Sequence, residues 1–199
     1  MKPVLMLLRH LFAILVLPFV MTIVIPRWII RGYGLVTSWP PGFATFTGQI
    51  LGGICFLIGL GLFLWCLYLF AMRGKGTLAP WDPPKHLVVT GPYRYVRNPM
   101  ISGVLMILLG EALFNGSASL GAWMLTFFVF NQIHFLIFEE PNLESRFGEE
   151  YRVYKSHVPR WIPRLSPYLP IHQVPLITKT FSGWVSHKAS KSRPSSKLP

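Results

Sequence analysis

The sequence predicts an all-α integral membrane protein with about four transmembrane helices. Of its 199 residues, 52% are hydrophobic and the mean hydropathy is +0.46, which is typical of a small membrane protein with little room for a soluble domain. The apolar residues gather in four runs separated by polar or turn-forming segments. The net charge of +12 comes from basic residues that flank these runs, which argues against nucleic-acid binding.

The four apolar runs cover residues 5–25, 46–72, 100–114 and 118–138. The first is expected to be a retained span, because no small-residue cleavage site precedes Pro26. An interfacial loop with Trp28, Tyr33 and Trp39 is expected to follow it. The second run would be about 40 Å long as a helix, which exceeds the hydrocarbon core. Its glycines predict close packing, more often within the chain than between copies: Gly48, Gly52, Gly53, Gly59 and Gly61.

The third and fourth runs are joined by the turn-forming residues 115–117, so they are expected to form a helical hairpin. After Pro141, apolar residues at helical spacing predict an amphipathic helix on the membrane surface: Leu143, Phe147, Tyr151 and Tyr154. Three regions result. Residues 1–45 hold the first span and the aromatic loop, 46–164 form the membrane core, and 165–199 form a basic Pro/Ser-rich tail without the apolar content to fold.

Basic residues predict the orientation. Of the 19 Lys and Arg residues, all but Arg27 and Arg31 fall on one predicted side, so both termini are expected to face the cytoplasm, in a bacterial inner membrane or the endoplasmic reticulum. Cys55 and Cys66 lie too far apart on one helix to form a disulfide. No Cys/His spacing predicts a metal site, and the oligomeric state stays open.

Residues 91–100, here called the hinge, are expected to build the active site. Asn98 and Pro99 indicate the cap and first residue of a helix, whose N-terminal N–H groups attract anions. Tyr93 adds an aromatic face that attracts cations, and Arg97 adds a fixed positive charge. The hinge therefore suits a ligand that carries both signs, such as S-adenosylmethionine. A basic turn that only anchors a helix at the lipid headgroups is the alternative.

The fourth run carries polar residues at a depth where they are costly unless they face a cavity or a partner: Asn131, Gln132 and His134. It ends in Glu139 and Glu140. Gln132 and Glu139 are seven residues apart, so they would share one face of an α-helix, and that face is expected to look into the site. Hydrogen bonding between helices is the alternative role for Asn131 and His134.

The stretch from Lys85 to Pro99, followed by Glu139-Glu140 and then by residues 147–151, resembles the isoprenylcysteine carboxyl methyltransferase family. Wider relatives of that family include phospholipid N-methyltransferases. The resemblance covers roughly residues 74–164 and implies a membrane-embedded, S-adenosylmethionine-dependent methyltransferase without a Rossmann domain. It implies cofactor contacts from Lys85, His86, Leu87, Val88, Tyr93, Asn98, Pro99, Met100 and Ile101.

The resemblance also implies that Glu139 lines the reaction site, where a carboxylate favours the positive charge of a sulfonium. Arg97 is the second catalytic candidate, and Gln132 and His134 are candidates, with Glu139, to bind the acceptor. The family's usual histidine and tyrosine are Asn98 and Ile101 in this sequence. An arginine thought to face the substrate carboxylate in the prenylcysteine enzymes corresponds to Phe135, so a prenylcysteine carboxylate fits poorly.

The sequence therefore predicts methyl transfer from S-adenosylmethionine to a lipophilic or lipidated acceptor at the cytoplasmic membrane face. Carboxylate, amine, thiol and hydroxyl lipids all remain possible acceptors, and membrane lipids are the expected surroundings. Two other functions stay open: a non-catalytic membrane protein for lipid binding or assembly, and a nicotinamide-dependent lipid reductase.

Overall fold

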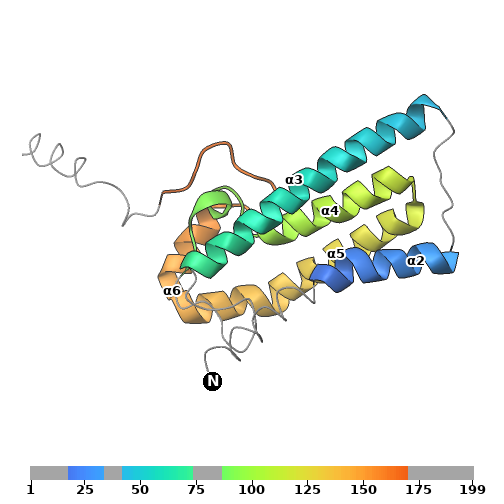
Figure 1. Cartoon of the computed structure of the whole chain (residues 1–199). Coiled ribbons are helices and arrows are strands. Elements are labelled where there is room, and N and C mark those ends of the chain that lie inside the picture. Colours follow the sequence, from blue (N-terminus) through green and yellow to red (C-terminus); the bar gives the residue numbers. More distant parts are fainter. Residues whose placement is uncertain (1–17, 34–41, 74–86, 170–199) are drawn as a thin grey trace, which may run out of the picture. The chain divides into compact units, whose positions relative to one another are not determined.

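The computed structural model describes residues 18–33, 42–73 and 87–169, and all regular elements within these ranges are helical. Lys85 and His86 lie outside the described residues, as do most of the first apolar run and of the tail. Residues 1–167 and 168–199 form separate units, and the helices below all belong to the first. Figure 1 shows its longest helix, α3 (Phe43–Arg73), beside α4 (Pro99–Asn115).

Glycines bring the backbones of α3 and α4 into contact. A Cβ atom on Gly59 would lie 2.6 Å from the carbonyl oxygen of Gly103, and one on Gly110 would lie 2.7 Å from that of Gly52. The two glycines of each helix are seven residues apart, two turns, so they share a face. The expectation of close packing within the chain is confirmed for Gly52 and Gly59, whereas Gly53 and Gly61 face open space.

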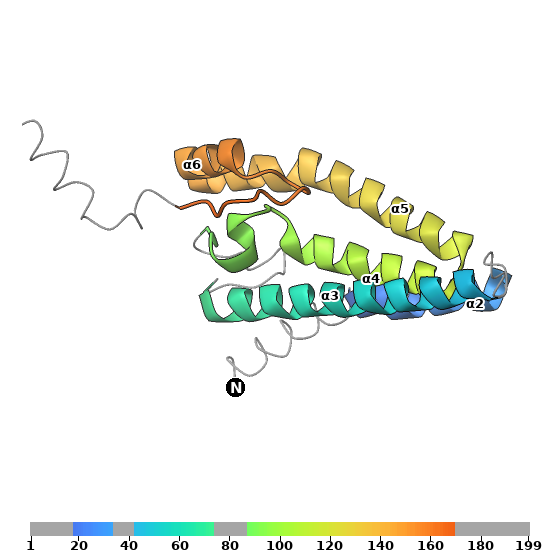
Figure 2. The same ribbon diagram turned by 90° about the horizontal axis from the view of Figure 1, so that it is seen from above.

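Helix α4 lies between α3 and α5 (Ala118–His134), as Figure 2 shows. The expected hairpin turn is present. Gly116 adopts the left-handed conformation with φ 60°, and the Ser117 hydroxyl accepts a hydrogen bond from the Leu120 N–H. A buried cluster of Val104, Leu108 and Phe127 holds the two helices together. The third and fourth apolar runs therefore fold back on each other as predicted.

The N-terminal segment corrects one expectation. Trp28 and Tyr33 do not form a loop, because a π-helical turn (Val20–Val24, η1) leads directly into α2 (Ile25–Tyr33). Pro26 lacks an N–H and cannot donate to the Met21 carbonyl, its partner in a π-turn. The Trp123 indole of α5 donates to that carbonyl instead, at 3.1 Å. A neighbouring helix thus allows the chain to stay helical through proline.

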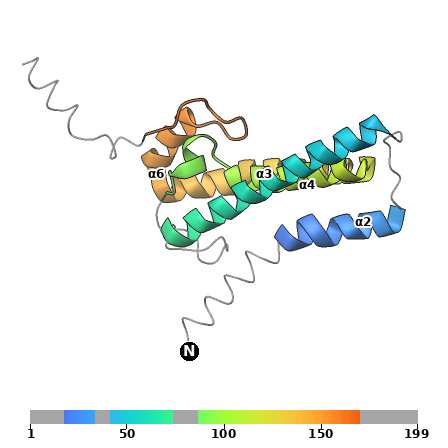
Figure 3. The same ribbon diagram turned by 45° about the horizontal axis from the view of Figure 1, so that its top comes forward.

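The fourth apolar run and the amphipathic helix expected after Pro141 form one continuous helix. Helix α5 runs through a second π-helical turn (Phe135–Glu139, η3) into α6 (Glu140–His157), and Pro141 lies inside it. The bend comes at Gly148 instead, with φ 53°. After α6, residues 158–164, here called the strap, run back toward the hinge (Figure 3).

The apolar surface is that of a membrane protein. Phe43–Leu69 and Ala118–His157 are long and apolar enough to cross a membrane, and Pro99–Asn115 is apolar but shorter. Their large side chains are mostly exposed: Phe46, Leu57, Trp65, Phe130 and Phe138 are all more than half accessible. A water-soluble fold would bury such residues, so lipid is the solvent that suits these helices.

The glycine contacts give a first prediction. Gly110→Ala should lower the thermal stability of the protein in detergent, because its methyl group meets the α3 backbone and overpacking costs about 1–3 kcal/mol. Gly53→Ala is the matched control, since its methyl group meets nothing within 4 Å and alanine favours the helix. Equal melting temperatures for the two variants would contradict this account of the α3–α4 contact.

Candidate functional site

The hinge begins with a 3-10 turn, η2 (Gly91–Arg94), pressed against α3. Gly91 has φ 58°, and a Cβ there would lie 2.7 Å from the Leu69 side chain, so glycine is needed for both conformation and space. Tyr93 is buried against Cys66 and Leu69. Burial, with Cys66 and Tyr154 nearby, raises the pKa of Tyr93 well above its usual range, so the phenol stays neutral.

Helix α4 starts at Pro99, as expected. Asn98 occupies the cap position, but its side chain makes no capping hydrogen bond. Its main-chain carbonyl instead accepts from the N–H and the hydroxyl of Ser102, at 3.1 and 3.0 Å. The asparagine therefore initiates the helix through its backbone, and its amide is not used in the cap.

The expected cofactor residues separate into two groups. Val88 and Met100 pack with Tyr93 on the cluster around Cys66. Ile101, one residue further, packs instead on the cluster between α4 and α5. Leu87 is half-buried and Pro99 is buried. Val88, Tyr93 and Met100 thus belong to one packed apolar cluster beside the hinge.

Glu140 is the electrostatic centre of this end of the protein. Its carboxylate is 5% exposed and pairs with Arg97 at 2.8 Å, with Lys155 at 2.9 Å and with Arg160. The side chains of Arg97 and Arg160 are themselves nearly buried. Lys155 also pairs with Glu144, at 2.7 Å. One buried carboxylate therefore connects α6 and the strap to the hinge, where Arg97 lies 43 residues earlier in the sequence.

The strap also pairs with the hinge through backbone hydrogen bonds. The Arg97 N–H donates to the Pro159 carbonyl at 2.9 Å, and the Arg164 N–H donates to the Tyr95 carbonyl at 3.0 Å. From α6, the Tyr154 hydroxyl donates to the Tyr93 carbonyl at 2.7 Å. In Figure 2 the strap lies between α6 and the hinge. These bonds satisfy main-chain groups that the short hinge turn leaves without helical partners.

Trp161 attaches the strap to α5. Its indole N–H donates to the Gln132 side-chain oxygen at 2.7 Å, and its ring lies 5.2 Å from that of Phe128 and 6.2 Å from that of Phe135. Gln132, an expected acceptor-binding residue, is therefore engaged by the strap. Phe135, which replaces the family arginine, faces the same tryptophan.

The π-turn η3 changes which glutamate shares a face with Gln132. A π-turn contains one more residue than an α-turn. Two turns after Gln132, the residue on the same face is therefore Glu140, whereas α-helical spacing would give Glu139. Gln132 and Glu140 accordingly contact the neighbouring strap residues Trp161 and Arg160. The expected shared face of Gln132 and Glu139 rests on α-helical spacing, and the π-turn interrupts that spacing.

The remaining expected residues belong to α5 and η3. Glu139 is half-buried. His134 is exposed and lies among aromatic rings, 5.6 Å from that of Phe138 and 6.4 Å from that of Phe130. Asn131 donates to the Phe127 carbonyl of its own helix rather than to another helix.

Two polar atoms at the hinge are buried without a hydrogen-bond partner: Thr90 Oγ1 and Arg97 Nε. Leaving such groups unsatisfied costs free energy unless a ligand or water meets them. The hinge thus offers a hydroxyl, an N–H donor and an apolar wall, together with more cationic than anionic side chains. This combination can hold a polar ligand that has an apolar part.

Several residues of the site were not predicted: Cys66, Thr90, Tyr154, Arg160 and Trp161. The basic and aromatic strap was visible in the sequence, but nothing in its spacing indicates where it returns. The buried pair of Glu140 and Arg97 spans 43 residues, so local periodicity carries no signal for it.

Comparison with known proteins identifies the family of the chain. A family model for phospholipid methyltransferases matches residues 47–150, more than half of the chain. The chain belongs to this phospholipid methyltransferase family. The family is related to the isoprenylcysteine carboxyl methyltransferases, so the resemblance is confirmed at that level. Its members are membrane methyltransferases, and the match includes α3, the hinge, α4, α5 and most of α6.

One protein that is similar in sequence is short. An uncharacterized protein of Haemophilus influenzae is 41% identical over 66 residues, which are 32% of this chain and the whole of that protein. No solved structure matches the chain. The strap follows the part of the chain that the phospholipid methyltransferase model matches.

The ion cluster gives a second prediction. Glu140→Gln should destabilise the protein by about 3–5 kcal/mol, because it leaves nearly buried Arg97 and Arg160 without a counter-charge. Glu149→Gln, which removes an exposed pair with Arg152, should cost about 0–1 kcal/mol. Thermal unfolding in detergent measures both. A Glu140→Gln variant as stable as Glu149→Gln would show that the strap is held by other contacts.

Proposed function

We propose that the protein transfers a methyl group from S-adenosylmethionine to a lipophilic acceptor at the membrane surface. The observation that carries this proposal is the phospholipid methyltransferase match, which contains both the hinge and the glutamate pair. The packing of the hinge against α3, α6 and the strap supports it, because a preorganised site is what methyl transfer requires. When bound, the cofactor supplies an electrophilic methyl group on a sulfonium.

The residues at the hinge fit such a cofactor. Val88 and Met100, which are only partly buried, would contact the aromatic base, and the buried Tyr93 would support them from the cluster around Cys66. The unpartnered Thr90 hydroxyl and Arg97 Nε suit polar and anionic groups of the ligand. Asn98 keeps its amide out of the helix cap, so it can serve as a further contact.

We assign distinct roles to the catalytic candidates. Glu139 is half-buried and carries the negative charge that would favour positive charge on the donor. Arg97 is held by Glu140 through one nitrogen while its Nε remains unpartnered, so it would position a ligand rather than move a proton. Glu140 serves the site indirectly, by fixing Arg97 and the strap.

For the acceptor, we infer a lipid whose reacting group is not a carboxylate. Phe135 offers no cation to bind a carboxylate, and its ring is packed near Trp161. His134 and the aromatic rings around it form an exposed face on α5 where a lipophilic acceptor could approach. Gln132 would contribute to acceptor binding indirectly, because it accepts the hydrogen bond that positions Trp161.

We also propose four membrane spans with both termini in the cytoplasm. Helices α3, α4 and α5 would be three of these spans. The helical segment 18–33 would continue the remaining span, which is the N-terminal one. The hinge, α6 and the strap, with their many basic residues, would then lie at the cytoplasmic headgroups.

Cofactor binding is the first test. S-Adenosylmethionine and its demethylated product should each bind the purified full-length protein in detergent, as measured by isothermal titration. Thr90→Val should weaken binding about two- to tenfold, the contribution of one hydrogen bond. Thr126→Val, whose exposed hydroxyl bonds within α5, is the matched control. Absence of heat with folded protein would refute the proposed function, and unchanged affinity in Thr90→Val would remove this hydroxyl from the site.

Measurement of turnover tests the role assigned to the Glu139 carboxylate. Glu139→Ala should lower kcat about 100-fold with radiolabelled cofactor and a total lipid extract, while cofactor affinity changes far less. The physical reason is that the carboxylate favours charge at the reacting centre rather than binding the rest of the cofactor. Glu149→Ala, on the exposed side of α6, should retain full activity. A Glu139→Ala variant with normal kcat would exclude Glu139 from the reaction.

A further inference from the structure

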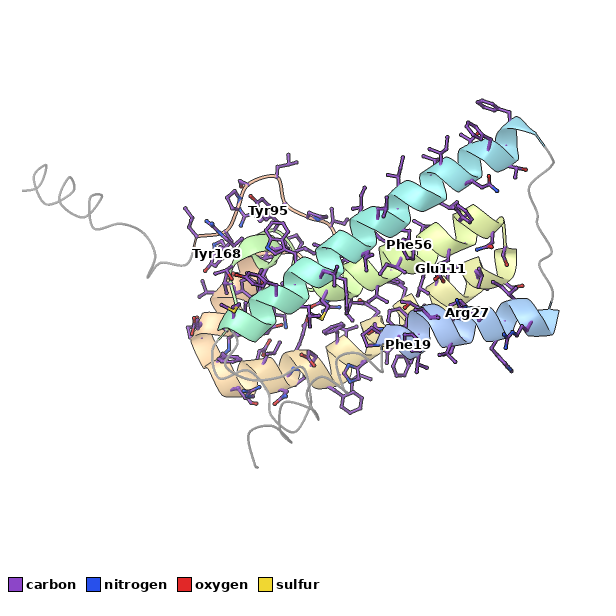
Figure 4. The ribbon with its side chains drawn as sticks, viewed as in Figure 1. Phe19, Arg27, Phe56, Tyr95, Glu111 and Tyr168 are labelled. Carbon is purple, nitrogen blue, oxygen red and sulfur yellow. The ribbon has the colours of Figure 1, made fainter. Side chains whose placement is uncertain are left out.

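Residues 162–165, here called the strap tip, present apolar side chains at the surface. Ile162 is 79% exposed and Leu165 is fully exposed, and Pro163 between them is exposed as well. The hinge residue Tyr95 is also exposed, and its main-chain carbonyl accepts from the Arg164 N–H at 3.0 Å. Figure 4 shows Tyr95 beside the strap. The strap tip and Tyr95 therefore form one exposed apolar edge.

This edge lies where the apolar part of α3 ends. The stretch of α3 that is apolar enough to cross a membrane is Phe43–Leu69. A Cβ atom on Gly91, at the start of the hinge, would lie 2.7 Å from the Leu69 side chain, so the hinge packs on the last turn of that stretch. Backbone hydrogen bonds fix the strap to the hinge. Exposed apolar side chains at this level are suited to contact with the membrane interface.

Arg164 gives the strap tip a positive charge without a counter-charge. Its guanidinium donates to the His157 carbonyl at 3.0 Å and to the Ser166 hydroxyl at 3.4 Å, and both acceptors are neutral. No carboxylate of the described residues lies within 4.0 Å of it, whereas Arg160 pairs with the buried Glu140. The sequence adds to this charge, because residues 151–199 hold nine Lys and Arg and no Asp or Glu. The strap tip is therefore suited to an anionic partner.

We propose that the strap tip enters the headgroup layer of an anionic membrane, where Arg164 binds the phosphate of an acidic phospholipid. Ile162 and Leu165 leave water for the upper acyl region, while the guanidinium donates to the phosphate. A zwitterionic lipid also has a phosphate, but its ammonium cancels the charge, so an acidic lipid attracts Arg164 more strongly.

A membrane is favoured over a protein partner because the edge continues the lipid-facing surface of α3, on which Trp65 and Tyr68 are more than half exposed. The inference rests on the proposed position of the hinge at the membrane surface. It is independent of methyl transfer.

The depth of a spin label tests the proposal. A nitroxide is attached to Leu165→Cys in the full-length protein, in nanodiscs of phosphatidylcholine with or without phosphatidylglycerol. The protein also carries Cys55→Ala, and Cys66 is completely buried. The label should meet oxygen, which concentrates in lipid, more than a water-soluble nickel complex, and phosphatidylglycerol should increase this preference. The same label at Glu149→Cys, on the exposed side of α6, should remain in water. Neither cofactor nor acceptor is present, so the result is separate from the test of methyl transfer.

Arginine variants test the charge. In anionic nanodiscs, Arg164→Gln should lower the ratio of inserted to water-exposed label about fivefold, the effect of one basic residue near an anionic surface. Arg164→Lys should restore most of the insertion. Arg152→Gln is the matched control, because Arg152 is exposed and already pairs with Glu149.

Three results would overturn the proposal. The first is a label at Leu165 that stays in water as it does at Glu149. The second is an insertion that changes neither with phosphatidylglycerol nor in Arg164→Gln. The third is magnetic broadening between labels on two copies in one nanodisc, which would place the strap tip against a second copy of the chain instead of lipid.

Discussion

The buried carboxylate of Glu140 is the interaction on which the hinge end of the protein depends. It meets cations from three segments, Arg97 in the hinge, Lys155 in α6 and Arg160 in the strap. Burying these charges is costly, so the arrangement persists only while all of them remain together. Lys155 also pairs with Glu144, so two carboxylates face three cations, and Arg97 keeps one unpartnered donor.

The packing of α3 against α4 is a second constraint on the hinge. Apolar side chains gain little by leaving lipid for one another, so helices in a membrane associate where small residues allow backbone contact. Gly52 and Gly59 meet Gly110 and Gly103 in this way, and the contact sets α4 in register with α3. That register brings Met100 to the cluster of Cys66 and Tyr93. The apolar cluster beside the hinge is thus a consequence of the glycine contacts between α3 and α4.

Many elements were predictable because they depend on local chemistry. Apolar runs indicated α3, α4 and α5, Asn98-Pro99 indicated where α4 starts, and Gly116 indicated the hairpin turn. The errors also have local causes. The loop expected after residue 25 is helical because Trp123 donates to the carbonyl that Pro26 leaves free, and the chain is helical through Pro141 too. Gly148, which looked like part of a regular helix, has a conformation that bends it.

The sequence by itself determined that this is a helical membrane protein with a polar hinge. It also determined that two acidic residues end the fourth apolar run. These features follow from hydropathy and from the residues that start helices, which act over a few residues. Only the tertiary structure decided which glutamate anchors the hinge, because the π-turn η3 shifts the register by one residue. It also decided that the strap pairs with the hinge, through backbone hydrogen bonds and through Glu140. Those pairings join residues far apart in the chain, and they form only when packed helices bring opposite charges into a medium that cannot solvate them.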